Sequence, residues 1–351
     1  MVTARPPAHY PPLRAAVLGT IAAASLAHQA GAAAPMSYMW SAGRQNDVIL
    51  PLNWFVLGVS VLVVVVSAAL VVLGVVRRRR AVAPGREDLP RLERSGAGLR
   101  WIAVGTILSI VPLLVAMAWT VVSLADIQSP PGDAALTLEI RGHQWWWEVQ
   151  YVDPKSHARS FTTANEIHVP VGQLVRIKLT TADVIHSFWV PALGGKTDLI
   201  PGQVNETWLI ANAPGEYRGQ CVEYCGQQHA HMALKVFAQA PDEFGKWWDR
   251  QLAPAPPPAS DMVQLGQEDF TARCGACHAV RGTLAGGIMG PDLTHLMSRT
   301  TIGSGAATNT PANLRTWVDS PDHFKPGVLM PAMKLDDGDL DKLTAWLLTL
   351  K

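Results

Sequence analysis

The hydrophobic positions of this chain form two long uncharged runs, followed by a region of short alternating patterns. Residues 48–76 contain no charged side chain, and a second uncharged run covers residues 101–125. A helix crosses the apolar part of a bilayer with about 20 apolar residues, so each run is long enough to span a membrane. The sequence therefore predicts a hairpin of two membrane helices within residues 35–126.

Arginines between the two runs indicate the orientation of this hairpin. Residues 77–80 are four consecutive arginines, and Arg86, Arg91 and Arg94 follow in the same loop. Positive loops stay in the cytoplasm, so residues 126 onward are expected outside it, with membrane lipid as a partner of the chain. An arginine cluster can also form a nucleic-acid surface, but the net charge of +1 gives no general affinity for polyanions. No nucleic-acid partner is expected.

The first 34 residues have the layout of a secretory signal peptide. Arg5 and Arg14 precede a small apolar run over residues 15–27, and Ala-Gly-Ala-Ala-Ala stands before Pro35. Basic, apolar and small-residue regions in this order are typical of a cleaved signal. The alternative is a disordered or loosely helical tail. On the first interpretation, residues 1–34 are absent from the mature protein.

After the hairpin, residues 127–251 change to a pattern with a period of two. Strand-like segments read L-T-L-E-I, E-I-H-V-P, L-V-R-I-K-L-T and T-W-L-I, with turn residues between them. Regular short strands separated by turns favour an all-β sandwich or Greek-key barrel. Within this region, G-H-Q-W-W-W-E places three tryptophans in succession. Because side chains alternate along a strand, at least one of them should be exposed or shared with a neighbouring surface, with Trp146 or Trp147 expected against a membrane or partner.

One loop of the predicted β-domain concentrates soft metal ligands. It reads G-Q-C-V-E-Y-C-G-Q-Q-H-A-H-M and contains Cys221, Cys225, His229 and Met232. Thiolate, thioether and imidazole ligands together favour copper, and two thiolates four residues apart can bridge a pair of copper ions. A second histidine must then come from elsewhere, and His186 is the candidate. A disulfide or a zinc site are the alternatives for the two cysteines.

A second cofactor motif follows a proline-rich linker at residues 252–260. Cys274, Cys277 and His278 form C-x-x-C-H, which attaches haem c through two thioethers and supplies one iron ligand. A redox-active C-x-x-C is the alternative. The chain ends in a predicted amphipathic helix whose apolar face contains Leu340, Leu343, Trp346, Leu347 and Leu350. Residues 261–351 are therefore expected to form an all-α haem domain.

Both motifs carry family resemblances. The copper loop, together with H-S-F-W-V-P-A-L-G-G-K-T-D, resembles subunit II of haem-copper cytochrome c oxidases, which implies a cupredoxin fold and a dinuclear CuA centre. By motif position the CuA ligands are His186, Cys221, Cys225, His229, Met232 and the carbonyl of Glu223. The resemblance also implies electron entry through Trp145 and a magnesium ion, shared with subunit I, at the Glu223 carboxylate.

The C-terminal region resembles a class I cytochrome c, in which Met330 has the position of the axial ligand and Met333 is the alternative. The complete order of segments is similar to subunit II of caa3-type cytochrome c oxidases. That resemblance implies that a soluble or membrane-bound cytochrome c, or another donor, reduces haem c. Electrons then pass through CuA to subunit I, which reduces oxygen and pumps protons in the bacterial inner membrane beside subunit III.

One position departs from the family pattern, and two other functions stay open. An acidic residue that assists proton entry in many family members is replaced here by Gly105, so Glu93 or another subunit could take its place, or this entry route differs. The chain could instead be the CuA subunit of a nitric oxide reductase. It could also be a membrane-anchored electron carrier or copper-handling protein without a catalytic partner.

Overall fold

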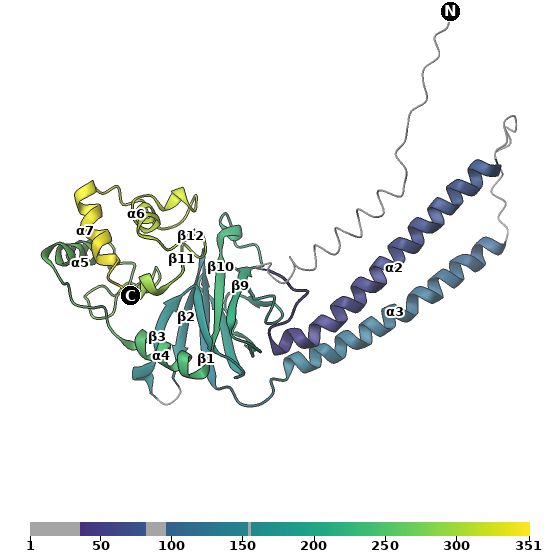
Figure 1. Cartoon of the computed structure of the whole chain (residues 1–351), viewed down its shortest axis with the longest axis horizontal. Coiled ribbons are helices and arrows are strands. Elements are labelled where there is room, and N and C mark those ends of the chain that lie inside the picture. Colours follow the sequence, from purple (N-terminus) through teal and green to yellow (C-terminus); the bar gives the residue numbers. More distant parts are fainter. Residues whose placement is uncertain (1–35, 82–95, 154–155) are drawn as a thin grey trace, which may run out of the picture.

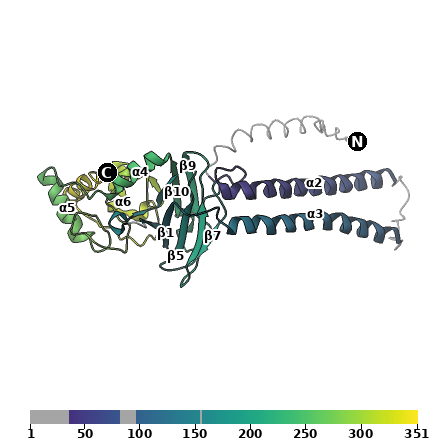
Figure 2. The same cartoon turned by 90° about the horizontal axis from the view of Figure 1, so that it is seen from below.

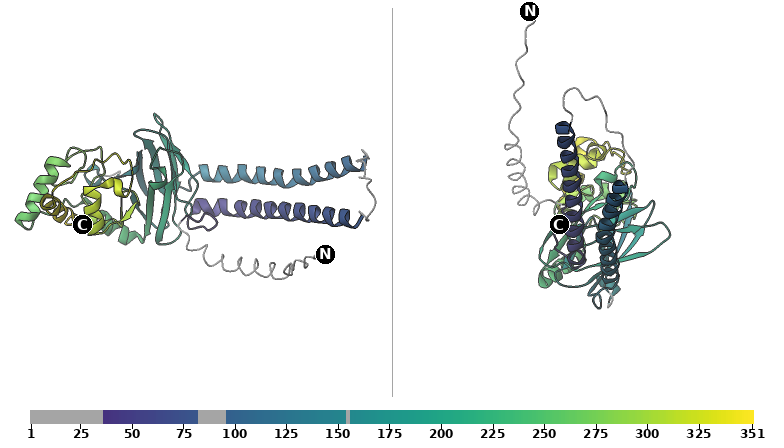
Figure 3. Two further views of the ribbon diagram at one scale, coloured as in Figure 1. Left: turned by 90° about the horizontal axis from the view of Figure 1, so that it is seen from above. Right: turned by 90° about the vertical axis from the view of Figure 1, so that its right-hand side faces the viewer.

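A computed structural model describes residues 36–81, 96–153 and 156–351 of the chain. Three parts follow one another in space: a pair of long helices, a β-sandwich and a small helical domain (Figure 1). The sandwich lies between the other two parts in Figure 2 and in the left view of Figure 3. The predicted signal peptide, the arginines beyond residue 81 and Glu93 lie outside the described residues.

Two helices are long and apolar enough to cross a membrane. Helix α2 covers Arg44–Ala81 and helix α3 covers Gly96–Gln128, and the two run side by side. The candidate spans are Arg44–Arg77 and Gly98–Gln128, whose 18-residue apolar windows have mean hydropathies of 3.1 and 2.3 and are almost entirely unburied. A long apolar surface without a protein partner is stable in lipid rather than in water. The hairpin predicted from the two uncharged runs is present, and each helix is longer than its run.

The base of the hairpin is attached to the sandwich by hydrogen bonds. The indole Nε1 of Trp208 donates to the carbonyl of Ile127 at the end of α3, at 2.6 Å. The carbonyl of Trp208 in turn accepts from the side-chain amide of Gln45 at the start of α2, at 2.7 Å. One residue of the sandwich thus contacts both helices, which fixes the sandwich close to the membrane.

Two five-stranded sheets form the sandwich. Their strand orders are β3-β2-β1-β5-β8 and β4-β10-β9-β6-β7. The strands are β1 Leu136–His143, β2 Trp146–Val152, β3 Phe161–Ala164, β4 Glu166–Pro170, β5 Val175–Thr181, β6 His186–Trp189, β7 Thr197–Leu199, β8 Asn205–Leu209, β9 Gly215–Cys221 and β10 Ala233–Gln239. Buried side chains alternate along β1 and β5, as the period-two pattern predicted. Helix α4 (Pro241–Leu252) closes one end of the sandwich with Trp247 and Trp248.

The three consecutive tryptophans have different surroundings. Trp147 is fully buried in the core of the sandwich, so of the two tryptophans predicted to face a membrane or partner only Trp146 could do so. Trp145 lies in the turn between β1 and β2 and is buried as well. Trp146 is half-buried and stacks on His143, with ring centroids 4.3 Å apart. Because Trp145 lies in the turn, its side chain does not follow the alternating in-and-out directions of the side chains on the two strands.

The C-terminal domain is built around two helices that cross at a glycine. Helix α5 (Asp261–Arg273) packs against helix α7 (Asp337–Leu347). A Cβ atom on Gly266 would lie 2.1 Å from the carbonyl oxygen of Lys342, so only glycine permits this approach. The remaining elements of this domain are β11 Thr301–Ile302, β12 Ala307–Thr308 and α6 Pro311–Asp319. The predicted apolar face of the terminal helix is buried, as Leu340, Leu343, Trp346, Leu347 and Leu350 all belong to the domain core.

Candidate copper and haem sites

Neighbouring strands bring the predicted copper ligands together. His186 is the first residue of β6 and Cys221 is the last residue of β9, and these two strands are paired. Strand β10 also pairs with β9, so the loop between them returns Met232 beside Cys221. This loop contains Cys225 and a single 3-10 turn that begins at His229. The fold therefore collects five side chains at one end of one sheet.

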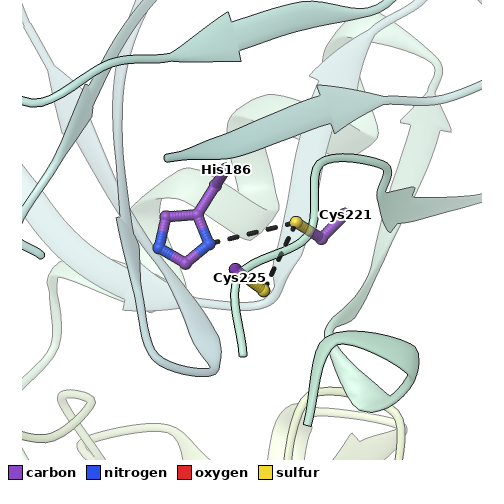
Figure 4. Close-up of side chains that lie close together, drawn as sticks. All are labelled: His186, Cys221 and Cys225. Carbon is purple, nitrogen blue, oxygen red and sulfur yellow. Dashed lines mark hydrogen bonds between the residues drawn. The ribbon is translucent and has the colours of Figure 1, made fainter. Parts of the chain in front are cut away.

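The sulfur and nitrogen atoms of this group face one another in a buried space. The Sγ atoms of Cys221 and Cys225 are 3.8 Å apart, and Cys221 Sγ lies 3.9 Å from Nδ1 of His186 (Figure 4). The donor atoms of these three residues all lie within 4.8 Å of one another. Cys225 Sγ lies 3.5 Å from Nδ1 of His229 and 3.8 Å from Sδ of Met232. Each sulfur thus has an imidazole of its own.

Backbone and carboxylate groups complete the surroundings. The carbonyl oxygen of Glu223 lies 3.3 Å from Cys221 Sγ. Asp183 Oδ1 lies 2.8 Å from Nε2 of His186, which leaves Nδ1 of that ring facing the sulfurs. A carboxylate on the outer nitrogen of a metal-binding histidine fixes the ring and strengthens it as a ligand. Gly142 makes room for the ring, because a Cβ there would lie 2.7 Å from Cδ2 of His186.

The charges of this cluster are coupled. The hydrogen bond from Cys225, followed by that of His186, lowers the pKa of the Cys221 thiol to about 4. The hydrogen bond that Cys225 makes to ionised Cys221, followed by burial, raises the pKa of Cys225, and the negative charge 3.8 Å away adds to this effect. Burial alone would lower the pKa of His186, but its bonds to Asp183 and Cys221 raise it. Two thiolates side by side need cations beside them, which bound metal supplies.

The C-x-x-C-H motif faces a cavity in the C-terminal domain. Cys274 caps the end of α5, and Cys277 and His278 follow in the next turn. Nδ1 of His278 lies 2.8 Å from the carbonyl oxygen of Pro291, and this contact leaves Nε2 available for iron. A Cβ on Gly290 would lie 2.5 Å from Cε1 of His278, so the ring fills the space above this glycine. Burial lowers the pKa of His278, which favours the neutral ring that a metal requires.

The cavity has a volume of 420 Å³ and is lined mainly by apolar side chains. Met330 and Met333 both reach its wall, as do both cysteines of the motif. A half-buried arginine also lines it: the Nε atom of Arg299 is buried and has no hydrogen-bond partner among the described residues. An unpaired guanidinium nitrogen in an apolar cavity matches a ligand that combines a flat apolar body with a carboxylate.

Residues of the β-sandwich close one side of the same cavity. Trp145 and Trp146 line it together with side chains of the C-terminal domain. The indole Nε1 of Trp145 donates to the carbonyl oxygen of Cys225 at 2.9 Å. Nε2 of Gln144 donates to the same oxygen at 2.7 Å. Trp145 therefore contacts both the haem cavity and the backbone of the copper loop.

Two family profiles match separate parts of the chain. The profile described as "Cytochrome C oxidase subunit II, periplasmic domain" matches residues 136–239, and the "Cytochrome c" profile matches residues 263–351. The cytochrome c oxidase subunit 2 of Alkalihalophilus pseudofirmus is 34% identical over 295 residues, which cover 82% of this chain and 82% of the relative. The chain belongs to the cytochrome c oxidase subunit 2 family.

Further relatives match parts of the chain. Cytochrome c oxidase subunit 2 of Bacillus sp. strain PS3 is 31% identical, with 71% of this chain and 73% of the relative covered. The crystal structure of the periplasmic domain of cytochrome oxidase subunit II from Bradyrhizobium japonicum is 36% identical. It covers 34% of this chain and 95% of that chain, with a TM-score of 0.32.

This cytochrome c oxidase subunit II contains a CuA-type site and a fused cytochrome c domain. The donor set of two thiolates, two imidazoles and one thioether fits copper, and the cavity with its C-x-x-C-H motif fits haem c. Cys221 and Cys225 are free thiols, so the disulfide alternative is wrong in this structure. Membership in the oxidase family favours an oxidase subunit over the subunit of a nitric oxide reductase and over a free electron carrier.

Sequence reasoning did not single out several residues of these sites. Asp183 was not singled out, although its carboxylate contacts the ring of His186. Lys325, Gln144 and Arg299 were not recognised at all, and they contact the cavity or the copper loop. Their neighbours come from segments far away in the sequence, so no local spacing could indicate these contacts. His231 lies beside the ligands but bonds Gln228 at 2.6 Å, in agreement with a role outside the motif.

Proposed function

We propose that this subunit is a two-centre electron relay, in which an external donor reduces the haem c domain and the electron then passes to the copper site and on to subunit I. The observation that carries this proposal is the position of Trp145, which lines the haem cavity and bonds the copper loop. When bound, haem c and the copper pair supply one-electron redox chemistry, and subunit I reduces oxygen and pumps protons.

The residues of the chain would hold these centres in place rather than react. His186, Cys221, Cys225, His229, Met232 and the carbonyl of Glu223 are the proposed copper ligands. A buried, hydrogen-bonded cluster between paired strands changes little in shape when the charge of a bound metal changes, which favours rapid electron transfer. Cys274 and Cys277 would attach the haem covalently, and His278 would bind its iron. Met330 would supply the second iron ligand, with Met333 as the alternative.

Trp145 tests this proposal directly. Trp145→Phe keeps an aromatic ring but removes the hydrogen bond from Nε1 to Cys225. After flash reduction of haem c, transfer of one electron to the oxidised copper site should slow by about tenfold, the effect of about 1.4 kcal/mol on a barrier. Trp248→Phe is the control, because this side chain of α4 packs against the core of the sandwich. Equal transfer rates in the Trp145→Phe variant and the unchanged protein would contradict a role of this indole.

The proposal places a magnesium ion at the carboxylate of Glu223, where this subunit would meet subunit I. Lys196 Nζ lies 3.9 Å from that carboxylate, whose side chain is 45% exposed. Magnesium binds through one or two carboxylates together with water. The Glu223 backbone and side chain would then serve different metals.

The proposed location is the bacterial inner membrane, with both redox domains outside the cytoplasm. The apolar surfaces of α2 and α3 support contact with lipid and with subunits I and III of the oxidase. The arginines that follow α2 support a cytoplasmic loop. A soluble or membrane-bound cytochrome c is the proposed donor.

A further inference from the structure

A lysine is buried where the haem domain meets the β-sandwich. Lys325 is 2% exposed and is among the largest fully buried side chains of the described residues. Burial lowers the pKa of its amine to about 7. Buried lysines are rare because the ammonium group loses its hydration, so a specific use of the amine should offset this cost.

The amine of Lys325 joins the two domains. It donates to the carbonyl oxygen of Trp145 at 2.6 Å and to that of Gly303 at 3.1 Å. Trp145 belongs to the sandwich, whereas Gly303 belongs to the turn between β11 and β12 of the haem domain. An apolar side chain of similar length could fill the same space, but it would leave two buried carbonyl groups without this donor.

The residues after Lys325 extend the same contact to the copper loop. The carbonyl of Pro326 accepts a hydrogen bond from Nε2 of Gln228, the residue before His229. A Cβ on Gly327 would lie 2.5 Å from Oε1 of Gln227, so the segment that contains Gly327 closely approaches the copper loop here. This Lys-Pro-Gly segment leads directly to Met330, which lines the haem cavity. One segment thus connects the wall of the haem cavity with the copper loop.

We propose that Lys325 is a positioning residue that holds the segment leading to Met330 against Trp145 and the copper loop, and thereby fixes the separation of the two electron carriers. The proposal rests on the relay function proposed above. Lys325 reaches the copper site only through others: through Trp145, whose indole bonds Cys225, and through Pro326, which bonds Gln228. Its loss should therefore change the distance between the carriers and leave each carrier intact.

Other contacts keep the domains together without Lys325. One carboxylate oxygen of Glu166 accepts from the backbone N–H and hydroxyl of Thr300, at 2.8 and 2.6 Å, and from the N–H of Thr301. Ser304 and Ala233 exchange two hydrogen bonds, of 2.7 and 3.0 Å. These anchors lie on the β11–β12 side of the interface. Removing the amine should loosen the segment near Trp145 while the haem domain stays attached.

The test compares Lys325→Met with the unchanged full-length protein carrying both centres. The first measurement is hydrogen exchange of the amide of Val328, which donates to the carbonyl of Lys325 at 3.0 Å. Exchange should accelerate on the order of tenfold, the effect of losing one or two ordinary hydrogen bonds. Lys342→Met is the matched control, since this lysine pairs with Asp339 on α7. It should leave exchange unchanged.

The second measurement is electron transfer between the centres. One electron leaves ferrous haem, which becomes ferric, and reduces the oxidised copper site, with no bond or proton exchanged. In Lys325→Met this rate should fall by about tenfold, the effect of about 1.4 kcal/mol on a barrier. The haem absorption and copper resonance spectra should match those of the unchanged protein. A purely structural defect would alter the spectra as well.

The possible results of the two measurements distinguish a failure of the Lys325 role from a failure of the relay. If Lys325→Met does not retain haem, Lys325→Gln replaces it, because its donor is one bond too short to reach both carbonyls. Unchanged exchange and unchanged transfer in the variant that retains haem would overturn the role of Lys325. If the unchanged protein itself transfers no electron, the relay fails, and the exchange experiment alone still decides whether Lys325 holds the interface.

Discussion

Cys221 and Cys225 behave as one unit because their sulfur atoms lie 3.8 Å apart in a buried loop. One thiol ionises easily and thereby suppresses ionisation of the other. His186 and His229 lie on different sulfurs, which is the arrangement that two bridged metal ions require. We therefore propose that the two cysteines share one pair of metal ions.

Replacing one of the two cysteines should abolish the dinuclear copper site. Cys225→Ser removes the sulfur that contacts both His229 and Met232, so the variant should bind one copper ion or none. Copper analysis and electron paramagnetic resonance of the purified protein measure this. His231→Gln is the control, because His231 bonds Gln228 and lies outside the donor group. A Cys225→Ser protein with a full copper pair would rule out a bridging role for this sulfur.

The ligand types and their spacing along one loop made this site predictable at the level of residues. Four of the donors fall within twelve positions, and the second histidine was found from its own short motif. The sequence could not decide between Trp146 and Trp147 as the exposed residue, because a pattern with a period of two does not show where the turn before β2 ends. Lys325 gave no signal, because its acceptors are Trp145 and Gly303, and burial of a lysine cannot be deduced from its neighbours in sequence.

At the scale of elements, β4, β10 and α4 enclose a histidine that should make stability depend on pH. The ring of His168 stacks between Phe237 of β10 and Trp247 of α4, at centroid distances of 4.8 and 4.1 Å. Burial lowers the pKa of His168 to about 4, despite its hydrogen bond to Gln239. The three elements therefore pack around a neutral ring.

The sign of this effect follows from which state takes up the proton. In the unfolded chain a histidine protonates near pH 6.5, whereas His168 in the folded protein stays neutral down to about pH 4. Between these values acid favours unfolding, so the free energy of unfolding should fall by about 2 kcal/mol from pH 7 to pH 5. Denaturant unfolding of the part of the chain that follows α3 measures it.

A variant without the titrating ring isolates this contribution. His168→Phe should lose most of the extra acid sensitivity, although it also loses the bond to Gln239. His157→Gln, on an exposed 3-10 turn, should keep the slope of the unchanged protein. The same acid sensitivity in His168→Phe and in the unchanged protein would show that other groups cause it.

Element types were easier to predict than their limits. Uncharged runs indicated both membrane helices, yet α2 begins at Arg44 and continues through Ala81, because charged residues are compatible with helix outside the bilayer core. The apolar face of the terminal helix was predictable because it repeats with helical period. Strand order was not, since β1 pairs in parallel with β5 across a long intervening segment.

In the whole molecule, the sandwich connects the membrane hairpin with the haem domain. Trp208 fixes the hairpin on one side, and Glu166, Ser304 and Lys325 fix the haem domain on the other (Figure 1). A proline-rich linker suggested a spacer, but Ala255 in this segment donates its N–H to Arg281 of the haem domain at 2.8 Å. The sequence could not show this docking, because every contact joins distant segments.

The central claim is that one chain holds a copper pair and a haem c in contact with the same tryptophan. Electron paramagnetic resonance of the oxidised protein that follows α3, together with its copper-to-iron ratio, tests it most directly. We expect hyperfine structure from one unpaired electron shared over two copper nuclei, and two coppers for each haem iron. A single-copper spectrum, or no copper signal together with a disulfide between Cys221 and Cys225, would contradict it and leave a tethered cytochrome c on an inert β-domain.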